Sequence, residues 1–267
     1  MEKISGLSLD MIPKPGETLK ELLVEKNMTQ KELAIRLGIT EKTITGIIRG
    51  SEPISEATAI KLEVIFGISA SFWNNLQANY NILIERQKML NSVTEEEKNL
   101  INDKTYKKLV DFKLIENKKD KISKVLSLRK LLGINNLCDA RCLLETQGCF
   151  RKSNQQSIDY LGLLIWLKLC EKFTEKNHVE KINLEKLKEN LNYIKGLSLE
   201  APKTFMPKLK EIFSGCGVDF QVIPDFPNVP IHGYIEKKTE KIILCLTIRY
   251  KFADIFWFSL FHELGHI

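Results

Sequence analysis

One short motif carries the clearest chemistry in this chain. His262-Glu263-Leu264-Gly265-His266 has the form H-E-x-x-H. Residues four apart lie on one face of a helix, so both imidazoles can reach the same Zn²⁺ while Glu263 lies beside a metal-bound water as general base. The spacing predicts half of a metallopeptidase site, with His262 and His266 as metal ligands and Glu263 as the catalytic residue.

The rest of such a site is harder to find in the sequence. A catalytic zinc takes three protein ligands and keeps a further position open for water. Only Ile267 follows His266, so the sequence offers no downstream residue as third ligand, and a truncated site is expected. His232 lies on a predicted strand, where a lone histidine is more often structural than a ligand. A simpler interpretation also stays open, in which two histidines happen to fall four apart on an amphipathic helix.

Apolar spacing places the motif on a helix that packs against a sheet. Residues 241–248 (KIILCLTI) are typical of a buried strand, and residues 252–261 have helical apolar spacing that leads into the motif. Further elements are predicted as strands at 218–223 and 229–236 and as helices at 184–195 and 202–214. If the chain ends inside this domain's central helix, four apolar side chains should be incompletely covered: Phe256, Trp257, Leu260 and Phe261.

The first part of the chain is predicted to be a compact helical domain. Helices are indicated at 18–26, 29–37, 41–48 and 55–66, and a longer one starts at 69 or 71. Thr29-Gln30-Lys31-Glu32 has the T-x-x-E form of a capping box, Gly38 can end that helix, and Thr40 can cap the next. Two short helices joined by a turn of three or four residues form a helix-turn-helix.

This segment resembles a known family over nearly its whole length. The stretch PGETLKELLVEKNMTQKELAIRLGITEKTITGIIRGSEPISEATAIKLEVIFGISASFWNNLQANY is similar to the Xre-type helix-turn-helix of HigA-type antitoxins. In such domains the second helix of the motif enters the major groove of DNA. The resemblance implies that Gln30 contacts a phosphate, and it assigns the other DNA contacts to Thr40, Glu41, Lys42, Thr43, Thr45 and Arg49.

A second resemblance concerns residues 183–267. The run LTIRYKFADIFWFSLFHELGH looks like the start of an ImmA/IrrE-type metallopeptidase domain. His262 and His266 match that family's histidine ligands and Glu263 matches its catalytic glutamate. The family's third ligand, an acidic residue further downstream, has no counterpart in this sequence. The resemblance implies a zinc cofactor and a regulatory protein as the peptide substrate.

Composition limits the class of protein. The chain has 267 residues, of which 43% are apolar and 28% charged, and this is typical of soluble globular proteins with room for two domains. It contains no apolar run of about eighteen residues and no signal-peptide layout, so a cytoplasmic protein without membrane contact is expected. The six cysteines include no C-x-x-C pair, which favours reduced thiols over a disulfide framework.

The distribution of charge bears on the DNA-binding prediction. The net charge of +6 favours an anionic partner, yet residues 1–85 hold nine Lys/Arg against eleven Asp/Glu. The positive excess lies later, in lysine-rich stretches such as 104–124, where a solvated helix face is the usual explanation. One copy of the domain should therefore bind DNA weakly, which favours a homodimer with two recognition helices on a roughly palindromic operator.

We therefore predict a mainly α protein: a five-helix helix-turn-helix DNA-binding domain at 1–86, a helical connecting region at 87–182, and at 183–267 an incomplete α+β zincin-like domain. The predicted function is a sequence-specific DNA-binding transcriptional regulator of antitoxin type, with operator DNA as partner. Two alternatives stay open. One is a zinc-dependent metallo-endopeptidase that cleaves a regulatory protein and is targeted by its DNA-binding domain. The other is an interaction protein that neutralises a toxin by contact.

Overall fold

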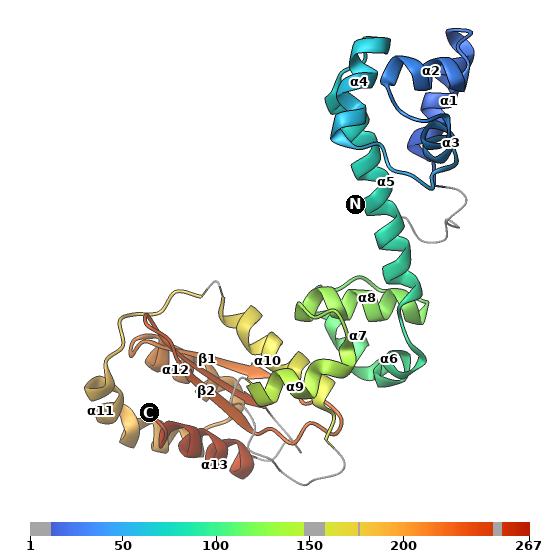
Figure 1. The fold of residues 1–267 in the computed structure, drawn as a ribbon. Coiled ribbons are helices and arrows are strands. Elements are labelled where there is room, and N and C mark those ends of the chain that lie inside the picture. Colours follow the sequence, from blue (N-terminus) through green and yellow to red (C-terminus); the bar gives the residue numbers. More distant parts are fainter. Residues whose placement is uncertain (1–11, 147–157, 176, 248–252) are drawn as a thin grey trace. The chain divides into compact units, whose positions relative to one another are not determined.

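The computed structural model describes residues 12–146, 158–175, 177–247 and 253–267 (Figure 1). It is mainly helical, with a helix-turn-helix domain at the N-terminal end and a three-stranded sheet near the C-terminal end, which confirms the predicted fold class. The chain divides into two compact units, residues 1–93 and 94–267. Within the described ranges, no helix has both the length and the apolar character needed to span a bilayer.

Five helices form the first unit: α1 (Pro15–Glu25), α2 (Gln30–Leu37), α3 (Glu41–Arg49), α4 (Glu56–Phe66) and α5 (Ala70–Asn91). Each helix from α2 to α5 begins at a hydroxyl side chain that accepts a backbone N–H of the first turn, from Thr29, Thr40, Ser55 and Ser69. α2, α3 and α4 end at glycines in the left-handed conformation. Glycine adopts this conformation at a lower energetic cost than residues that carry a Cβ atom. Local sequence signals thus set the lengths of these short helices.

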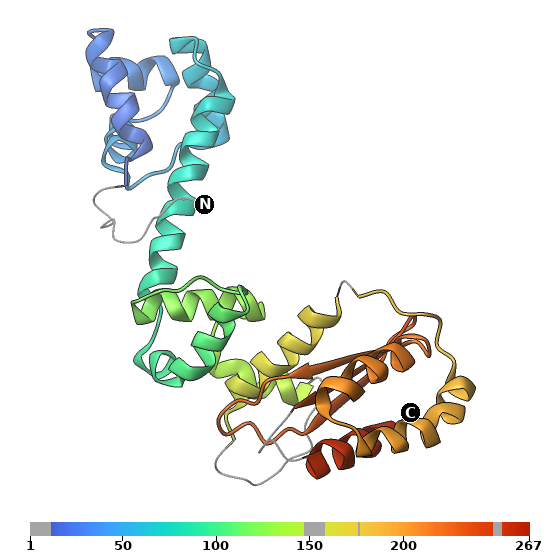
Figure 2. The same cartoon turned by 180° about the vertical axis from the view of Figure 1, so that it is seen from behind.

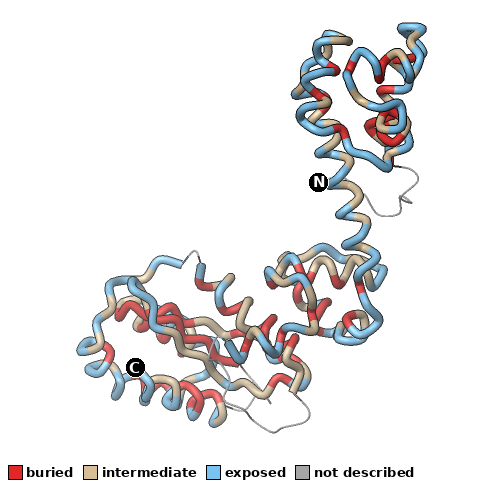
Figure 3. The backbone as a smooth tube through the Cα atoms, viewed as in Figure 1, coloured by how far each residue is buried: buried red, intermediate tan, exposed pale blue. Residues whose placement is uncertain are grey.

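The core of the first unit takes at least one apolar side chain from every helix. Five large side chains of this core have no exposed surface: Leu19, Leu33, Ile44, Leu62 and Trp73. Each contributes about 1.5–3 kcal/mol relative to an exposed position. Along α1 to α4, buried positions are interspersed with exposed ones (Figure 3), so each of these helices turns one face inward and leaves the other to solvent. In α5 only Trp73 is buried.

The second unit begins with a helical part that surrounds a buried ion pair. Its elements are α6 (Glu95–Leu100), α7 (Asp103–Asp111), α8 (Lys121–Leu132), the short 3₁₀ helix η2 (Leu137–Asp139) and α9 (Ala140–Thr146). The guanidinium of Arg129 donates two hydrogen bonds to the carboxylate of Glu97, at 3.0 and 2.6 Å, and the backbone N–H of Leu137 donates a third at 2.9 Å. The pair joins α6, α8 and η2 through one carboxylate.

A three-stranded sheet organises the rest of the second unit. The strands β1 (Val218–Ile223), β2 (Gly233–Lys237) and β3 (Ile242–Thr247) lie in the order β1-β3-β2. β1 runs parallel to β3, with Val218 opposite Ile242, and β2 runs antiparallel to β3, with Gly233 opposite Leu246. β2 and β3 therefore form a hairpin.

Helices cover the two faces of this sheet. α10 (Tyr160–Thr174) packs on one face, while α12 (Pro202–Ser214) and α13 (Ala253–Leu264) pack on the other, where α11 (Leu184–Gly196) and the 3₁₀ helix η3 (Leu197–Leu199) complete the layer (Figure 2). The strands alternate accordingly: Leu244 and Leu246 enter the core beside α13, and Cys245 meets Cys170 of α10. The five cysteines in the described ranges are free thiols.

The structure departs from the sequence predictions at two places near the sheet. The predicted strand at 229–236 is shorter and begins at Gly233, because Pro230 has no N–H to donate to a ladder. The prediction that four aromatic and aliphatic side chains of α13 are poorly covered is wrong for three of them, since Phe256, Trp257 and Leu260 are buried in the core of this unit. Phe261 is 36% exposed. Residues 248 and 252, which the predictions include, lie outside the described ranges.

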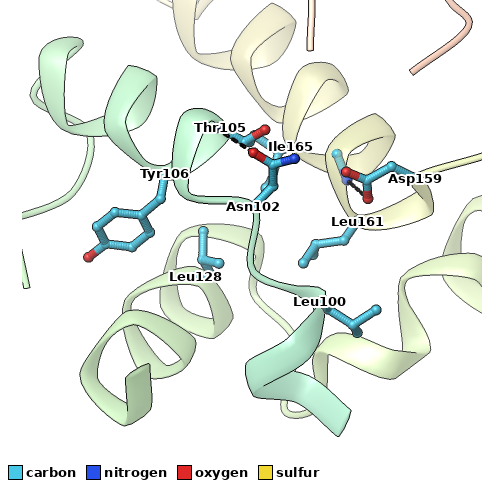
Figure 4. A pocket seen from close by; sticks show the side chains of 9 residues that line it. Leu100, Asn102, Thr105, Tyr106, Leu128, Asp159, Leu161 and Ile165 are labelled. Carbon is cyan, nitrogen blue, oxygen red and sulfur yellow. Dashed lines mark hydrogen bonds between the residues drawn. The ribbon is translucent and has the colours of Figure 1, made fainter. Parts of the chain in front are cut away.

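A small cavity lies between α7, α8 and the first turn of α10 (Figure 4). Its volume of about 10 Å³ is roughly the room that one water molecule requires. The Thr105 hydroxyl is buried and has no hydrogen-bond partner within the described ranges, and the Asp159 carboxylate accepts the N–H of Gly162 at 2.8 Å. Burial raises the pKa of Asp159 above its ordinary value, although the backbone N–H groups of Gly162 and Leu161 act in the opposite direction.

The buried ion pair yields a stability prediction. Replacing Glu97→Ala leaves Arg129, whose side chain is 6% exposed, without its partner, so we expect the free energy of unfolding to fall by about 3–5 kcal/mol. The control is Glu95→Ala, which removes a surface pair whose glutamate is 80% exposed and should reduce the free energy of unfolding far less. Urea unfolding followed by circular dichroism measures both. Equal losses in the two variants would contradict a structural role for the pair.

Asp159 yields a prediction of opposite sign. Its folded-state pKa is raised, so its charged form disfavours the fold, and this penalty is present at neutral pH and disappears as the pH falls through the folded-state pKa. Asp159→Asn keeps an oxygen that can accept the Gly162 N–H and removes the buried charge. We expect a higher melting temperature for the variant at pH 7, and a difference that shrinks as the pH is lowered and the wild-type carboxyl takes up its proton.

Candidate nucleic-acid interface

α2 and α3 form a helix-turn-helix whose turn consists of Gly38, Ile39 and Thr40. Gly38 has φ +63° and ends α2, and the backbone N–H of Ile39 returns to the carbonyl of Ala34 at 3.0 Å. The Thr40 hydroxyl then accepts the N–H of Thr43 at 3.1 Å and starts α3. The turn therefore satisfies its own backbone groups and fixes the angle between the two helices.

α3 presents a polar face to solvent. Its inner face is held by Ile44 and Ile47, which are 0% and 2% exposed. The predicted DNA-contacting residues lie on the remaining surface: Thr40, Glu41, Lys42 and Arg49 are exposed, and Thr43 and Thr45 are half-buried. The hydroxyls of Thr40 and Thr43 lie 2.9 Å apart and share a hydrogen bond. The first turn of α3 thus offers hydroxyls, a carboxylate and an ammonium group within a short stretch.

Gln30 and Thr45 are brought together across the two helices. The Thr45 hydroxyl donates to Oε1 of Gln30 at 2.9 Å, although the two residues are fifteen positions apart. With its oxygen occupied, the Gln30 amide has its two N–H donors left for other partners, and donors at a helix N-terminus suit an anionic oxygen. Thr45 therefore positions Gln30, a role that its place in the sequence does not reveal.

Gly16 is a positioning residue that the sequence analysis missed. A Cβ atom built at Gly16 would lie 2.0 Å from the carbonyl oxygen of Ile47, so the first turn of α1 rests directly on the backbone of α3. Any side chain there would push α3 out of place. The available signal was a glycine directly after Pro15, in a helix start where glycine is a poor helix former.

The H-E-x-x-H residues lie at the end of α13 and just beyond it. Both imidazoles are exposed, and their Nε2 atoms are 3.4 Å apart. The His262 ring also stacks on Phe258, with ring centroids 6.3 Å apart. Two nitrogens that bind one tetrahedral zinc at about 2.0–2.1 Å lie roughly 3.3–3.4 Å from each other. The separation of His262 and His266 fits two ligands of a single ion.

Glu263 lies against β2. A Cβ atom at Gly233 would come within 2.5 Å of its Cγ and 2.7 Å of its Oε1, so the bare backbone of Gly233 makes room for the carboxylate. No local pattern connects Gly233 with the motif, which lies 29 to 33 residues further along the chain. His232, its neighbour, is exposed, and its carbonyl accepts the N–H of Thr247 at 3.0 Å. Within the described ranges, no cluster of three or more histidines, cysteines or carboxylates is placed to hold a metal.

Comparisons with known proteins concern the N-terminal part of the chain. A family described as helix-turn-helix matches residues 19–73. The uncharacterized HTH-type transcriptional regulator YddM of Escherichia coli (strain K12) is 33% identical over 70 residues, which make up 26% of this chain and 74% of that protein.

Solved structures match a similar share of the chain. An addiction module antidote protein of the HigA family from Coxiella burnetii is 34% identical over 31% of this chain and 96% of its own, with a TM-score of 0.28. The Pseudomonas aeruginosa antitoxin HigA with the higBA promoter is 30% identical over 32% of this chain and 97% of its own, also with a TM-score of 0.28.

The family match at residues 19–73 spans α2, the turn and α3, the same segment that forms the helix-turn-helix in the structure. The bacterial regulator is 33% identical to this chain over 74% of its own length, which indicates common descent. Through its N-terminal domain, the chain belongs to the helix-turn-helix family of transcriptional regulators.

Proposed function

We propose that this chain is a sequence-specific transcriptional regulator of antitoxin type that contacts operator DNA through α2 and α3. The main support is the arrangement of α3. Its inner face is buried at Ile44 and Ile47, while Thr40, Glu41 and Lys42 at its N-terminal end are exposed. Family membership and the sequence resemblance to HigA-type antitoxins support the proposal.

The chemistry of α3 suits direct reading of base edges. In the major groove, the Lys42 ammonium would donate to the O6 and N7 acceptors of guanine, and the Glu41 carboxylate would accept from the N4 amino group of cytosine. Thr40 and Thr43 can donate or accept. Gln30 would bind a phosphate through its amide N–H groups and so fix the register of α3 on the duplex.

We further propose that two copies act together on a roughly palindromic operator. Residues 1–85 carry nine basic and eleven acidic residues, so a single domain has little electrostatic attraction for DNA. Two recognition helices spaced by one helical turn of DNA, about 34–36 Å, would double the specific contacts. Sedimentation of the protein with a selected operator measures this stoichiometry.

A double-mutant cycle tests the proposed roles of Gln30 and Thr45. The operator is first selected from a random duplex library with the full chain. Gln30→Ala should then weaken binding to all duplexes by about tenfold, because a phosphate contact carries no sequence information. Thr45→Val should weaken binding less, and it should have no further effect in the Gln30→Ala background. An equal loss in both backgrounds would mean that Thr45 contacts DNA itself.

Lys42→Ala tests base reading by α3. We expect a loss of about 1–3 kcal/mol on the selected operator, together with relaxed preference at one base position. Lys61→Ala on the exposed side of α4 is the matched control and should change neither quantity. Fluorescence anisotropy on the operator and on single-base variants measures both effects. Selection of no preferred sequence by the full chain would refute the proposed function.

We propose zinc binding at His262 and His266 as a second function, because their Nε2 atoms are separated by the distance that a shared tetrahedral ion requires. A bound zinc supplies Lewis acidity for the hydrolysis of a peptide bond, with a regulatory protein as the proposed substrate. The Glu263 carboxylate, which lies against Gly233, would serve as the base that accepts a proton. Among the described residues, no third histidine, cysteine or carboxylate forms a metal-binding group with this pair.

Zinc binding is tested by competition with a chromogenic chelator after exhaustive dialysis of the full chain. We expect saturable binding near one zinc per chain that weakens at least about tenfold in His262→Ala and in His266→Ala. His232→Ala, which changes an exposed histidine outside the motif, should bind as the wild type does. Unchanged binding in His262→Ala would remove the motif as the metal site.

A further inference from the structure

The positive charge of the chain is concentrated in one segment of the second unit. Residues 103–130 contain ten Lys/Arg and four Asp/Glu, a net charge of +6. This equals the net charge of the whole chain, so all other residues together are neutral. The segment comprises α7, α8 and the link between them.

The acidic residues of this segment are mostly engaged. The Asp103 carboxylate forms an ion pair with the Lys124 ammonium at 2.7 Å, and Glu116 forms one with Lys118. The Asp120 carboxylate caps α8 by accepting the N–H of Ser123 at 2.7 Å. The lysine partners hold the pKa values of Asp103 and Glu116 below their ordinary range, through hydrogen bonds first and charge second. These carboxylates therefore remain ionised and satisfied.

Six lysines of this segment form no ion pair with these carboxylates, and we call them the α7–α8 lysine cluster. All six side chains are exposed, and none forms an ion pair within 4.0 Å in the described part of the chain: Lys104, Lys107, Lys113, Lys119, Lys121 and Lys130. Lysines of the same segment that form ion pairs, such as Lys108 with Asp225, do not belong to the cluster.

The segment that carries the cluster is held in shape by internal contacts. The ion pair of Lys124 with Asp103 joins the first turn of α8 to the first turn of α7. The Tyr106 hydroxyl donates to the carbonyl of Glu116 at 2.8 Å and ties the link to α7, and the Lys124 ammonium lies 5.2 Å from the centre of the Tyr106 ring. The unpaired lysines thus belong to a segment whose two helices and link are joined by side-chain contacts.

The first unit lacks the charge that binding to a polyanion needs. On α2 and α3 the available cations are few, since Arg36 is bound to Glu32 at 2.6 Å. Affinity for duplex DNA has a large sequence-independent part, which comes from lysines and arginines that displace counterions from phosphates. The helix-turn-helix can read bases, but the charges that would supply this part lie in the second unit.

We propose that the α7–α8 lysine cluster is a second DNA-binding site, which contacts the sugar-phosphate backbone of duplex DNA without sequence preference. The cluster supplies electrostatic affinity and α3 supplies selectivity. This inference rests on the proposed DNA-binding function for its biological setting. Its ligand chemistry, a series of phosphates, follows from six exposed ammonium groups, since the one arginine of the segment, Arg129, is buried against Glu97.

The test compares two variants of the full chain with equal net charge. In the cluster variant, Lys104, Lys107, Lys119 and Lys121 are changed to Gln. In the control variant, four exposed and unpaired lysines of α11 and α12 are changed to Gln: Lys188, Lys195, Lys203 and Lys210. Binding of each protein to a random-sequence duplex of about 30 base pairs is measured by fluorescence anisotropy between roughly 50 and 300 mM KCl.

We expect the slope of log K against log [KCl] to become shallower by about 2–4 in the cluster variant, since each lost phosphate contact removes about 0.9. The control variant should stay within about one unit of the wild type. Changing the same four cluster residues to Arg should restore the slope, which separates loss of charge from loss of fold. Equal changes in the two Gln variants, or no change in either, would overturn the proposal. So would tighter binding of the wild type to single-stranded RNA than to the duplex.

The same measurements separate this inference from the proposed function. If the chain selects an operator and the cluster variant keeps the wild-type salt slope, only the second DNA site is wrong. If the cluster variant loses affinity for random duplexes while no preferred sequence can be selected, the site stands and the sequence-specific function is wrong. Loss of all DNA binding in the wild type rejects both.

Discussion

The seating of α3 on α1 is the constraint on which the nucleic-acid interface depends. A helix of nine residues is marginal in water by itself, because its nucleation cost is spread over few hydrogen bonds. α3 therefore owes its position to burial of Ile44 and Ile47 and to the direct approach of Gly16 to the Ile47 carbonyl. The orientation of every polar side chain on the outer face of α3 depends on these contacts.

Much of the first unit could be predicted from the sequence because its signals are local. The hydroxyl caps at Thr29 and Thr40 and the left-handed glycines at Gly38 and Gly50 mark helix ends within one or two residues. Apolar spacing then assigns the buried faces. Contacts between distant residues could not be predicted in this way. The hydrogen bond from Thr45 to Gln30, and the approach of Glu263 to Gly233, depend on packing angles that no local pattern encodes.

The second unit shows the same division between local and distant information. The strand at 242–247 follows from a continuous apolar run, and the strand at 218–223 follows from apolar residues that alternate with Asp219 and Gln221. The antiparallel partner follows from the short connection between β2 and β3. Thr94 and Glu97 form a capping box, but this local signal does not reveal that the Glu97 carboxylate is buried. Its sequence neighbours Glu95 and Glu96 are exposed, and only the fold brings Arg129 and the Leu137 N–H to it. Burial alone would raise the pKa of Glu97, but these donors outweigh it and hold the value below its ordinary range.

The placement of β2 at the side of the sheet has a consequence for how this protein behaves at high concentration. In the described part of the chain β2 pairs only with β3, so its other side carries backbone groups that a strand from another molecule could use. β2 is five residues long, and charged side chains crowd its end at Glu236, Lys237 and Lys238. A short, charged edge disfavours edge-to-edge pairing with a strand of another molecule, and such pairing is the first step of fibrous aggregation.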